Sequence, residues 1–215
     1  GPALGLALAR AGLSVGVIDA QPARARATAA FDGRAYALAI ASMRLLSAIG
    51  VWPALAGDSQ PILRIIACDS HTAPAHALHF DSAEIEEGAM GHMVEDRHLY
   101  AAFLEAMAAT PGLTHYPAST VTDHQAAPGH VTATLGDGRQ LGARVLVACD
   151  GRASPTAARA GIKRNGHAYG QTALVAAIAH ARPHQGIARQ IFPPNGPLAI
   201  LPLTGDRSSI VWSET

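Results

Sequence analysis

The sequence carries little charge and no excess of either sign. Of its 215 residues, 16 are Lys or Arg and 16 are Asp or Glu, so the formal net charge at pH 7 is zero. The basic residues are scattered, and the chain lacks the basic run that attracts nucleic acid or an anionic membrane. This composition argues against a polymer-binding role, and we expect no nucleic-acid partner.

Cysteine is scarce, and long apolar runs are missing. The two cysteines, Cys68 and Cys149, each lie in an apolar stretch that predicts a strand. Because cysteine is among the most often buried residue types, we interpret both as buried free thiols in a reducing compartment, with a disulfide or a catalytic thiol as the alternatives. No stretch approaches the ~20 apolar residues of a membrane span, and no signal peptide is visible. We therefore expect a cytoplasmic protein whose membrane contact is peripheral, at the inner face.

Patterns for metal binding and hydrolysis are missing as well. Eleven histidines are present, but His71, His76 and His79 are separated across a loop and have no cysteine ligand nearby. The sequence has no Gly-x-Ser-x-Gly elbow, so Ser154 and Asp150 do not predict a hydrolase triad. We predict no metal site and no catalytic side chain.

The first 19 residues predict half of a βαβ unit. Residues 1–12 are small and apolar and end at a helix-stopping glycine, and residues 13–19 form a short apolar strand. In dinucleotide-binding folds, glycines let the backbone approach a pyrophosphate at a helix N-terminus, and an acid about 20 residues further on binds ribose hydroxyls. Gly1 and Asp19 fit this separation, with Gly1 as the last glycine of the Gly-x-Gly-x-x-Gly motif. Gly5 in that role leaves a short helix, and a chance arrangement is the other alternative.

The chain begins at Gly1-Pro2 without a methionine, directly on this helical pattern. We therefore expect a fragment of a longer protein. We expect it to bind a dinucleotide weakly or not at all by itself, because two glycines of the phosphate loop would lie upstream.

The kind of predicted element changes after the turn at Gly151, from mixed helices and strands to strands alone. Apolar periodicity predicts helices at 35–49 and 95–109. Apolar runs predict strands at 62–69, 77–80, 113–116, 130–135 and 144–149, and then four consecutive strands at 171–180, 188–192, 198–202 and 208–213. The sequence thus predicts a mixed α/β (α+β) part followed by an antiparallel sheet.

A second nucleotide-binding feature ends the run Arg-Val-Leu-Val-Ala-Cys-Asp. Asp150 can direct its carboxylate at a ribose or ribityl hydroxyl, and Gly151 allows close approach of a pyrophosphate. A simple turn after a strand is the alternative, because Asp and Gly are common in turns.

Five segments in order carry a resemblance to a known family. They are Gly1 to Asp19, DGRAYAL (32–38), MVEDRHL (93–99), LVACDGRAS (146–154), and GPLAILPL (196–203) with SSIVW (208–212). The chain resembles the FAD-dependent aromatic hydroxylases of the p-hydroxybenzoate hydroxylase class. Within that class it is most similar to the ubiquinone-biosynthesis branch, the 2-polyprenylphenol and 2-polyprenyl-6-methoxyphenol hydroxylases.

The resemblance implies a Rossmann-like FAD-binding domain interleaved with a mostly antiparallel substrate-domain sheet. The expected boundaries are 1–58 and 92–160 for FAD binding, and 59–91 and 161–215 for the substrate domain. Both domains would be incomplete, because the family's third flavin motif would lie downstream of Thr215.

The resemblance also implies roles for single residues. Asp19 would bind the adenosine ribose of FAD, Arg34 would lie beside the flavin, Arg97 would contact FAD, and Val121 would touch adenine through its backbone. A solvated loop arginine is the alternative for Arg34, and an ordinary surface residue is the alternative for Arg97.

Asp150 and Gly151 match the family's Asp-Gly motif for FAD and NAD(P)H. Family members often carry an arginine seven residues after the Asp, where this chain has Ala157. Arg159 is a candidate substitute, which puts the role of this motif toward NAD(P)H in doubt.

The implied activity is hydroxylation of a polyprenylated phenol in ubiquinone biosynthesis. NAD(P)H would reduce FAD, and a flavin C4a-hydroperoxide formed with O2 would oxidise the ring, so that no side-chain nucleophile is needed. Peripheral association with the membrane or a biosynthetic complex is compatible with such a substrate, and the resemblance implies no particular oligomeric state. The alternatives are a flavoenzyme of the same fold with a soluble aromatic substrate, a nicotinamide-dependent Rossmann dehydrogenase with further βα units after residue 165, and a non-catalytic binding module.

Overall fold

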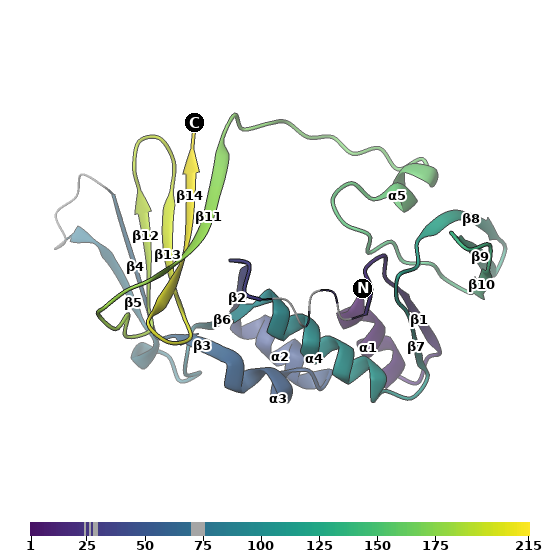
Figure 1. Ribbon diagram of the computed structural model, residues 1–215, viewed down its shortest axis with the longest axis horizontal. Coiled ribbons are helices and arrows are strands. Elements are labelled where there is room, and N and C mark those ends of the chain that lie inside the picture. The colour runs from purple at the N-terminus through teal and green to yellow at the C-terminus, as the bar shows by residue number, and fades with distance from the viewer. Residues whose placement is uncertain (24, 26, 28–29, 70–75) are drawn as a thin grey trace. The chain divides into compact units, whose positions relative to one another are not determined.

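The chain folds into two compact units, each formed by two separate stretches of sequence. The computed structural model describes residues 1–23, 25, 27, 30–69 and 76–215 (Figure 1). One unit comprises Gly1–Ala25 and Phe103–His167, and the other comprises Arg26–Ala102 and Ala168–Thr215. Residues 26–58 and 92–102 thus fold with the unit that contains the later strands. The assignment of an FAD-binding domain and a substrate domain to particular residues stays a prediction.

The first unit begins with the predicted helix and strand. Helix α1 (Pro2–Arg10) has a proline in its first turn and is followed by Gly12 at φ +85°, the left-handed conformation that ends many helices. Strand β1 (Val15–Ile18) pairs in parallel with β7 (Leu113–Tyr116). The predicted helix and strand are thus confirmed, and the strand belongs to a parallel pair.

Gly5 lies where α1 crosses β1 most closely. A Cβ atom placed on this buried glycine would be 2.5 Å from Cγ2 of Val17 and 3.7 Å from Cδ1 of Leu113. At Gly1, the same atom would be 3.9 Å from its nearest neighbour, an ordinary contact. Gly5 therefore allows the close helix–strand packing that one glycine provides in dinucleotide-binding folds.

We expect Gly5→Val to destabilise the protein by about 2–3 kcal/mol, because an oversized side chain in a packed contact forces the helix from the strand. The free energy of unfolding would be measured by urea denaturation. Gly142→Ala is the matched control, since that glycine of the same unit has no atom within 4 Å of its added Cβ. Equal stability of the two variants would contradict the close approach.

The rest of the first unit is a small antiparallel sheet and a short helix. Strands β8 (Val121–Ala127), β9 (His130–Leu135) and β10 (Gln140–Ala143) pair in the order β10-β9-β8, and α5 (Pro155–Arg159) follows. Strands β8 and β10 were not among the predicted elements.

The strand predicted at 144–149 does not form. Residues 145–149 have no regular structure, and among the described residues they pair with no strand. Val145 and Val147 are 72% and 50% exposed. An apolar run becomes a strand only when a neighbour satisfies its backbone hydrogen bonds, and the described strand β1 pairs with β7 alone.

The second unit contains a three-stranded sheet with β6 in its centre. Strand β6 (Gly91–Glu95) pairs antiparallel with β2 (Ala35–Ala39) and β3 (Ser59–Ile62). Two helices follow β2, α2 (Ile40–Ala48) and the short α3 (Trp52–Leu55), and η1 (Ala56–Asp58) is a 3-10 turn. The prediction of a helix over 35–49 was therefore wrong for its first five residues, where pairing with β6 overrides the helix propensity of alanine.

Helix α4 (Asp96–Ala108) follows β6 directly and confirms the helix predicted at 95–109. The boundary between the two units falls inside this helix. The acids Glu95 and Asp96 at its start are 2% and 4% exposed, although both carry carboxylates.

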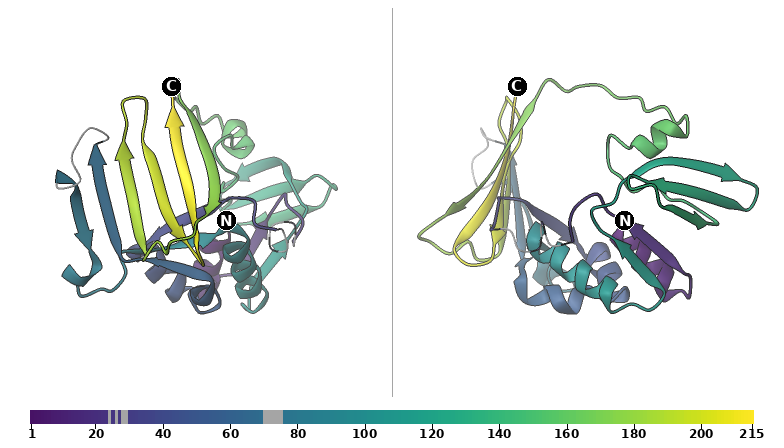
Figure 2. Two further views of the ribbon diagram at one scale, coloured as in Figure 1. Left: turned by 60° about the vertical axis from the view of Figure 1, so that its left-hand side comes forward. Right: turned by 45° about the vertical axis from the view of Figure 1, so that its right-hand side comes forward.

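A six-stranded sheet completes the second unit, in the order β11-β14-β13-β12-β4-β5 (Figure 2). Its strands are β4 (Arg64–Asp69), β5 (Leu78–Asp81), β11 (Thr172–Ala179), β12 (Ile187–Phe192), β13 (Leu198–Leu203) and β14 (Arg207–Glu214); η3 (Ser82–Glu84) is a 3-10 turn after β5. All neighbours are antiparallel except β12 and β4. The antiparallel strands predicted after residue 165 are confirmed, whereas a nicotinamide-dependent dehydrogenase would continue with alternating βα units.

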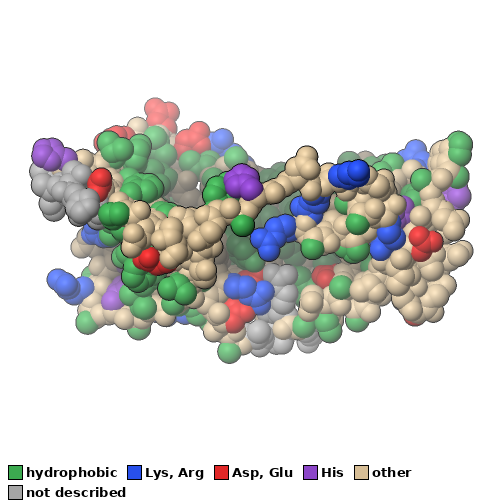
Figure 3. Space-filling view, turned by 90° about the horizontal axis from the view of Figure 1, so that it is seen from above, with side chains coloured by type: hydrophobic (Ala, Val, Ile, Leu, Met, Phe, Trp, Pro, Cys, Tyr) green, Lys and Arg blue, Asp and Glu red, His purple; other side chains and the backbone are tan. Residues whose placement is uncertain are grey.

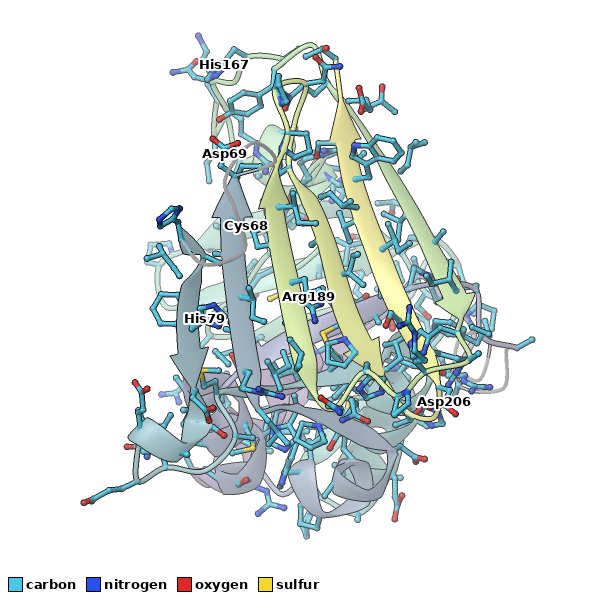
Figure 4. All side chains as sticks on the ribbon, turned by 90° about the vertical axis from the view of Figure 1, so that its left-hand side faces the viewer. Cys68, Asp69, His79, His167, Arg189 and Asp206 are labelled. Atoms are coloured by element: carbon cyan, nitrogen blue, oxygen red, sulfur yellow. The ribbon has the colours of Figure 1, made fainter. Side chains whose placement is uncertain are left out.

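The core of the second unit joins its two sheets. Ile62, Met93, Ala188 and Leu203 are buried together, from β3, β6, β12 and β13. Cys68, His79 and Arg189 lie on the face of the large sheet that is turned to the viewer in Figure 4. The large sheet therefore buries one end of its opposite face against the β2-β6-β3 sheet.

Charged side chains of both signs are present on the face drawn in Figure 3. Among the described helices, none is by itself long and apolar enough to cross a membrane, although α2 and residues 52–58 pass that test together as a pair bent by 119°.

Candidate functional site

In the first unit, the structure brings the helix N-terminus and the strand end that a dinucleotide needs to one edge of the β1-β7 sheet. Gly1 is the N-cap of α1, and its added Cβ would lie 4.0 Å from Cγ1 of Val17 in β1. Asp19 follows β1, where its Oδ1 accepts a hydrogen bond of 2.9 Å from the N–H of Gln21. Its carbonyl accepts a hydrogen bond of 2.9 Å from the N–H of Ser119. Gly1 and Asp19 thus lie at the helix start and after the strand, and their roles toward phosphate and ribose stay predictions.

Val121 is the first residue of β8, and its backbone is partly engaged. Arg159 donates from Nη2 to the carbonyl oxygen of Val121 at 3.0 Å and to the hydroxyl of Thr156 at 3.3 Å. Arg159 thereby ties α5 to β8. The adenine contact of Val121 stays a prediction. Arg159 uses Nη2 for hydrogen bonds within the protein, and this nitrogen would have to give up these bonds to contact a nucleotide.

Asp150 caps the start of α5. Its carboxylate accepts a short hydrogen bond from the hydroxyl of Ser154 and one of 3.1 Å from the N–H of Thr156. Although desolvation raises the pKa of Asp150, these hydrogen bonds outweigh it and lower that pKa to about 2. Gly151 adopts φ +91°, and its added Cβ would have no atom within 4 Å. The turn at Gly151 therefore has open space beside its Cα atom.

We expect Ser154→Ala to raise the pKa of Asp150 toward its ordinary value of 3.8, because the hydroxyl hydrogen bond favours the ionised carboxylate. The folded pKa lies below the unfolded one, so this carboxylate stabilises the fold above pH ~4 and loses that contribution as pH falls toward 2. Carbon-13 NMR titration of Asp150 measures the shift. Ser119→Ala, a change in the same unit, should leave it unmoved; an unchanged Asp150 in Ser154→Ala would refute the cause.

Asp-Gly-Arg occurs three times in the sequence, and in two of these turns, 32–34 and 137–139, the aspartate accepts two hydrogen bonds from the arginine. Arg34 donates from its N–H to Oδ1 of Asp32 at 3.1 Å and from Nε to Oδ2 at 2.8 Å. Arg139 makes the same bonds to Asp137, at 3.0 and 2.7 Å. The arginine hydrogen bonds lower the pKa of both aspartates.

The surroundings distinguish the two clamped arginines. Nη2 of Arg34 lies 3.9 Å from Oδ2 of the buried Asp96, and the carbonyl of Arg34 accepts a hydrogen bond of 3.0 Å from the N–H of Asp96. The hydroxyl of Tyr36 donates to Oδ1 of Asp96 at 2.7 Å. Arg34 is thus attached to the β6–α4 junction.

Arg97 lies at that same junction, one residue beyond Asp96. Its Nε donates to Oε2 of Glu95 at 2.8 Å. The second unit therefore brings together Arg34 and Arg97, two predicted site residues far apart in sequence, around two buried acids. Gly1, Asp19, Val121, Asp150 and Gly151 belong to the first unit.

Several residues of this junction were missed by sequence reasoning. They are Tyr36, Glu95, Asp96 and Arg207, of which Arg207 donates to Glu95 at 2.7 Å. The available signal was the pair of acids directly after the apolar end of β6, since two adjacent carboxylates seldom follow a buried strand without cations nearby.

Two predictions about other side chains can be compared with the structure. Both cysteines are free, but Cys149 is exposed and Cys68 is half-buried, so the expectation of two buried thiols was wrong. Cys149 is exposed because the strand predicted around it does not form. Within the described residues, no group of three His, Cys, Asp or Glu side chains could hold a metal ion; His71 lies outside them.

The first unit also has an apolar groove of about 480 Å³, lined by the β8–β9 hairpin, residues 144–148 and α5. The predicted cofactor residues do not line it.

The residues present suit FAD in their chemistry. A helix N-terminus favours a pyrophosphate, a carboxylate after β1 suits ribose hydroxyls, and two arginines supply donors for anionic or carbonyl oxygens.

The fold is that of FAD-dependent monooxygenases of the p-hydroxybenzoate hydroxylase type. The crystal structure of p-nitrophenol 4-monooxygenase PnpA from Pseudomonas putida DLL-E4 matches with a TM-score of 0.80 and 15% identity, over 99% of this chain and 54% of that one. Residues 1–213 match the model of the FAD binding domain family. The chain belongs to this family, and FAD is its cofactor.

Two curated relatives with 30% or more identity are hydroxylases named for ubiquinone or its precursor. Ubiquinone hydroxylase UbiL of Rhodospirillum rubrum is 44% identical over 214 residues, which are 100% of this chain and 49% of that protein. The 3-demethoxyubiquinol 3-hydroxylase of Escherichia coli is 33% identical over 100% of this chain and 55% of its own length. The chain thus spans about half the length of the curated relatives that it matches.

Proposed function

We propose that the full-length protein is an FAD-dependent monooxygenase that hydroxylates the aromatic ring of a polyprenylated phenol in ubiquinone biosynthesis, with NAD(P)H as the electron donor. The 44% identity to a ubiquinone hydroxylase across the whole chain carries this proposal. The same five segments that suggested the family are contained in the matched region.

The chain's own residues would bind and orient the cofactor. The N-terminus of α1 at Gly1 would face the pyrophosphate, and Asp19 would accept hydrogen bonds from the adenosine ribose. Arg34 and Arg97 would donate to flavin or phosphate oxygens. Asp150, whose pKa is about 2, is ionised at neutral pH and can accept hydrogen bonds from hydroxyl groups beside Gly151.

Bound FAD would supply the oxygen-activating chemistry, so the protein needs no nucleophile of its own. The large sheet would contribute apolar surface for the substrate. Leu174 of β11 and its direct partner Trp212 of β14 lie on one face of the sheet and are 54% and 40% exposed. A ring with an apolar prenyl chain suits such a surface, and that chain would favour peripheral contact with the inner face of the membrane.

Substrate profiling of the full-length protein tests the proposal. We expect a bound-flavin absorption spectrum, and hydroxylated product by mass spectrometry from a short-chain polyprenylphenol with NADH or NADPH. A protein that hydroxylates p-hydroxybenzoate but no prenylated phenol would support a flavoenzyme with a soluble substrate instead. Purification without flavin, and no flavin uptake, would contradict the monooxygenase altogether.

A further inference from the structure

The buried carboxylate of Glu95 is shared between two arginines from distant parts of the chain. Its Oε1 accepts from Nη2 of Arg207 at 2.7 Å, and its Oε2 accepts from Nε of Arg97 at 2.8 Å, with Nε2 of His98 at 3.5 Å. Glu95 is 2% exposed. A buried carboxylate is tolerated when cations and hydrogen bonds offset its desolvation. Each oxygen of Glu95 therefore has its own guanidinium.

Arg207 is held on several sides by the protein. It lies at the start of β14, directly after Asp206, which is labelled in Figure 4. Its Nη2 and Nε donate to the hydroxyl and the carbonyl of Thr204, both at 3.2 Å. Its guanidinium lies 5.2 Å from the ring centroid of Phe31, next to the Asp32-Gly33-Arg34 turn. Arg207 is thus a fixed structural cation.

Arg97 is held on one edge only. In the part of the chain that the structure describes, its Nε bonds to Glu95, and its two terminal nitrogens donate no hydrogen bond to protein atoms. One third of its side chain is exposed, 33%. The edge of the guanidinium that a ligand would use is therefore available, and its direction is set by Glu95.

We propose that Glu95 and Arg207 are positioning residues for the cofactor-binding Arg97. This inference rests on the proposed role of Arg97 toward FAD. Arg207 occupies one carboxylate oxygen, so Arg97 can bind only the other and keeps its terminal nitrogens for an oxygen of FAD. Without Arg207, both oxygens of Glu95 would be available to Arg97. A guanidinium and a carboxylate favour the two-bond, fork-to-fork pair, which would turn those nitrogens away from the cofactor.

A double-variant cycle on the full-length protein tests the proposal. The dissociation constant for FAD would be measured by flavin fluorescence for wild type, Arg207→Met, Arg97→Met and the double variant. We expect Arg97→Met to weaken binding about 10- to 100-fold, as for a charged hydrogen bond. We expect Arg207→Met to weaken FAD binding about 10-fold when Arg97 is present and less than about twofold when Arg97 is already methionine. The reason is that Arg207 acts on FAD binding through Arg97.

Conservative and surface variants separate positioning from folding. Arg207→Lys should recover most of the affinity, because an ammonium can still donate to Oε1 of Glu95. Arg44→Met removes a surface arginine of the same unit that pairs with Glu87, and should leave the affinity unchanged. If Arg207→Met weakens FAD binding equally with and without Arg97, Arg207 acts through the fold and the proposal is overturned.

A measurement on the FAD-free protein keeps the two proposals distinguishable. Nitrogen-15 NMR of arginine side chains reports rotation about the guanidinium bonds. In Arg207→Met, we expect slowed rotation of the Arg97 terminal groups, as a two-bond pair with Glu95 requires; unchanged rotation would overturn the positioning role. If Arg97→Met leaves FAD affinity intact, the cofactor role of Arg97 fails, whatever the NMR result.

Discussion

Replacing Gly196 with alanine is expected to lower the free energy of unfolding by about 3–5 kcal/mol. Gly196 is buried in the turn between β12 and β13 and adopts φ +148°. A Cβ at this position would lie 2.3 Å from the carbonyl oxygen of Ser213 and 2.9 Å from its carbonyl carbon. Both are backbone atoms of β14, so no side-chain rotation relieves the clash.

Gly205→Ala separates steric clash from backbone strain. Gly205 has φ +74°, but its added Cβ would meet no atom within 4 Å. Its substitution should therefore cost only the left-handed strain, about 1–2 kcal/mol. Chemical denaturation followed by the fluorescence of Trp212, the neighbour of Ser213, measures both variants. A Gly196→Ala protein as stable as Gly205→Ala would show that β14 does not approach the turn so closely.

Replacing Arg34 with methionine in the full-length protein is expected to weaken FAD binding about 10- to 100-fold, because the proposed role of Arg34 makes it a charged donor to FAD. Arg139→Met is a closely matched control. It removes the same charge from the same Asp-Gly-Arg clamp, with hydrogen bonds of 3.0 and 2.7 Å in place of 3.1 and 2.8 Å. Among the described residues, Arg139 pairs with Asp137 and with no buried acid, so Arg139→Met should change the affinity less than about twofold.

Fluorescence titration with FAD would compare the two arginine variants, with thermal unfolding recorded for each. Equal losses of FAD affinity in both variants would show that the loss comes from the change in net charge or from the broken Asp–Arg hydrogen bonds of the turn. An unchanged affinity in Arg34→Met would remove this arginine from the cofactor site.

Local sequence patterns predicted the helices with regular apolar spacing and the strands that pair with near neighbours in sequence. Helix α1 with its terminating Gly12, helix α4, and the four strands from β11 to β14 follow directly from apolar spacing and turn residues. Residues 35–39 show where this reasoning ends. Their alanines favour a helix, but β6, more than 50 residues later in sequence, pairs with them along the whole strand. The opposite error at 144–149 has the same origin, because an apolar run cannot reveal whether a neighbouring strand is present.

The candidate site was predictable one residue at a time but not as an arrangement. The motif resemblance identified Arg34 and Arg97 separately. In the structure, Arg34 lies near Asp96 and Arg97 binds Glu95, so both arginines are held at the β6–α4 junction by adjacent buried acids. The bond between Arg207 and Glu95 spans 112 positions, which no sequence spacing encodes. Gly1 was predicted from its separation from Asp19, whereas the closer approach between helix and strand belongs to Gly5, whose added Cβ would lie 2.5 Å from Val17, against 4.0 Å at Gly1.

The parallel contact between β4 and β12 has a consequence for synthesis on the ribosome. Arg64 pairs with Ile187, and Asp69 pairs with Phe192, so the β4–β5 hairpin emerges more than 100 residues before its neighbour is translated. During that interval one edge of β4 has no partner, and Ile65 and Ile66 remain open to other chains. Long-range pairing of this kind slows folding and exposes unpaired edges to aggregation. The edge of β4 is therefore covered only once β12 has left the ribosome.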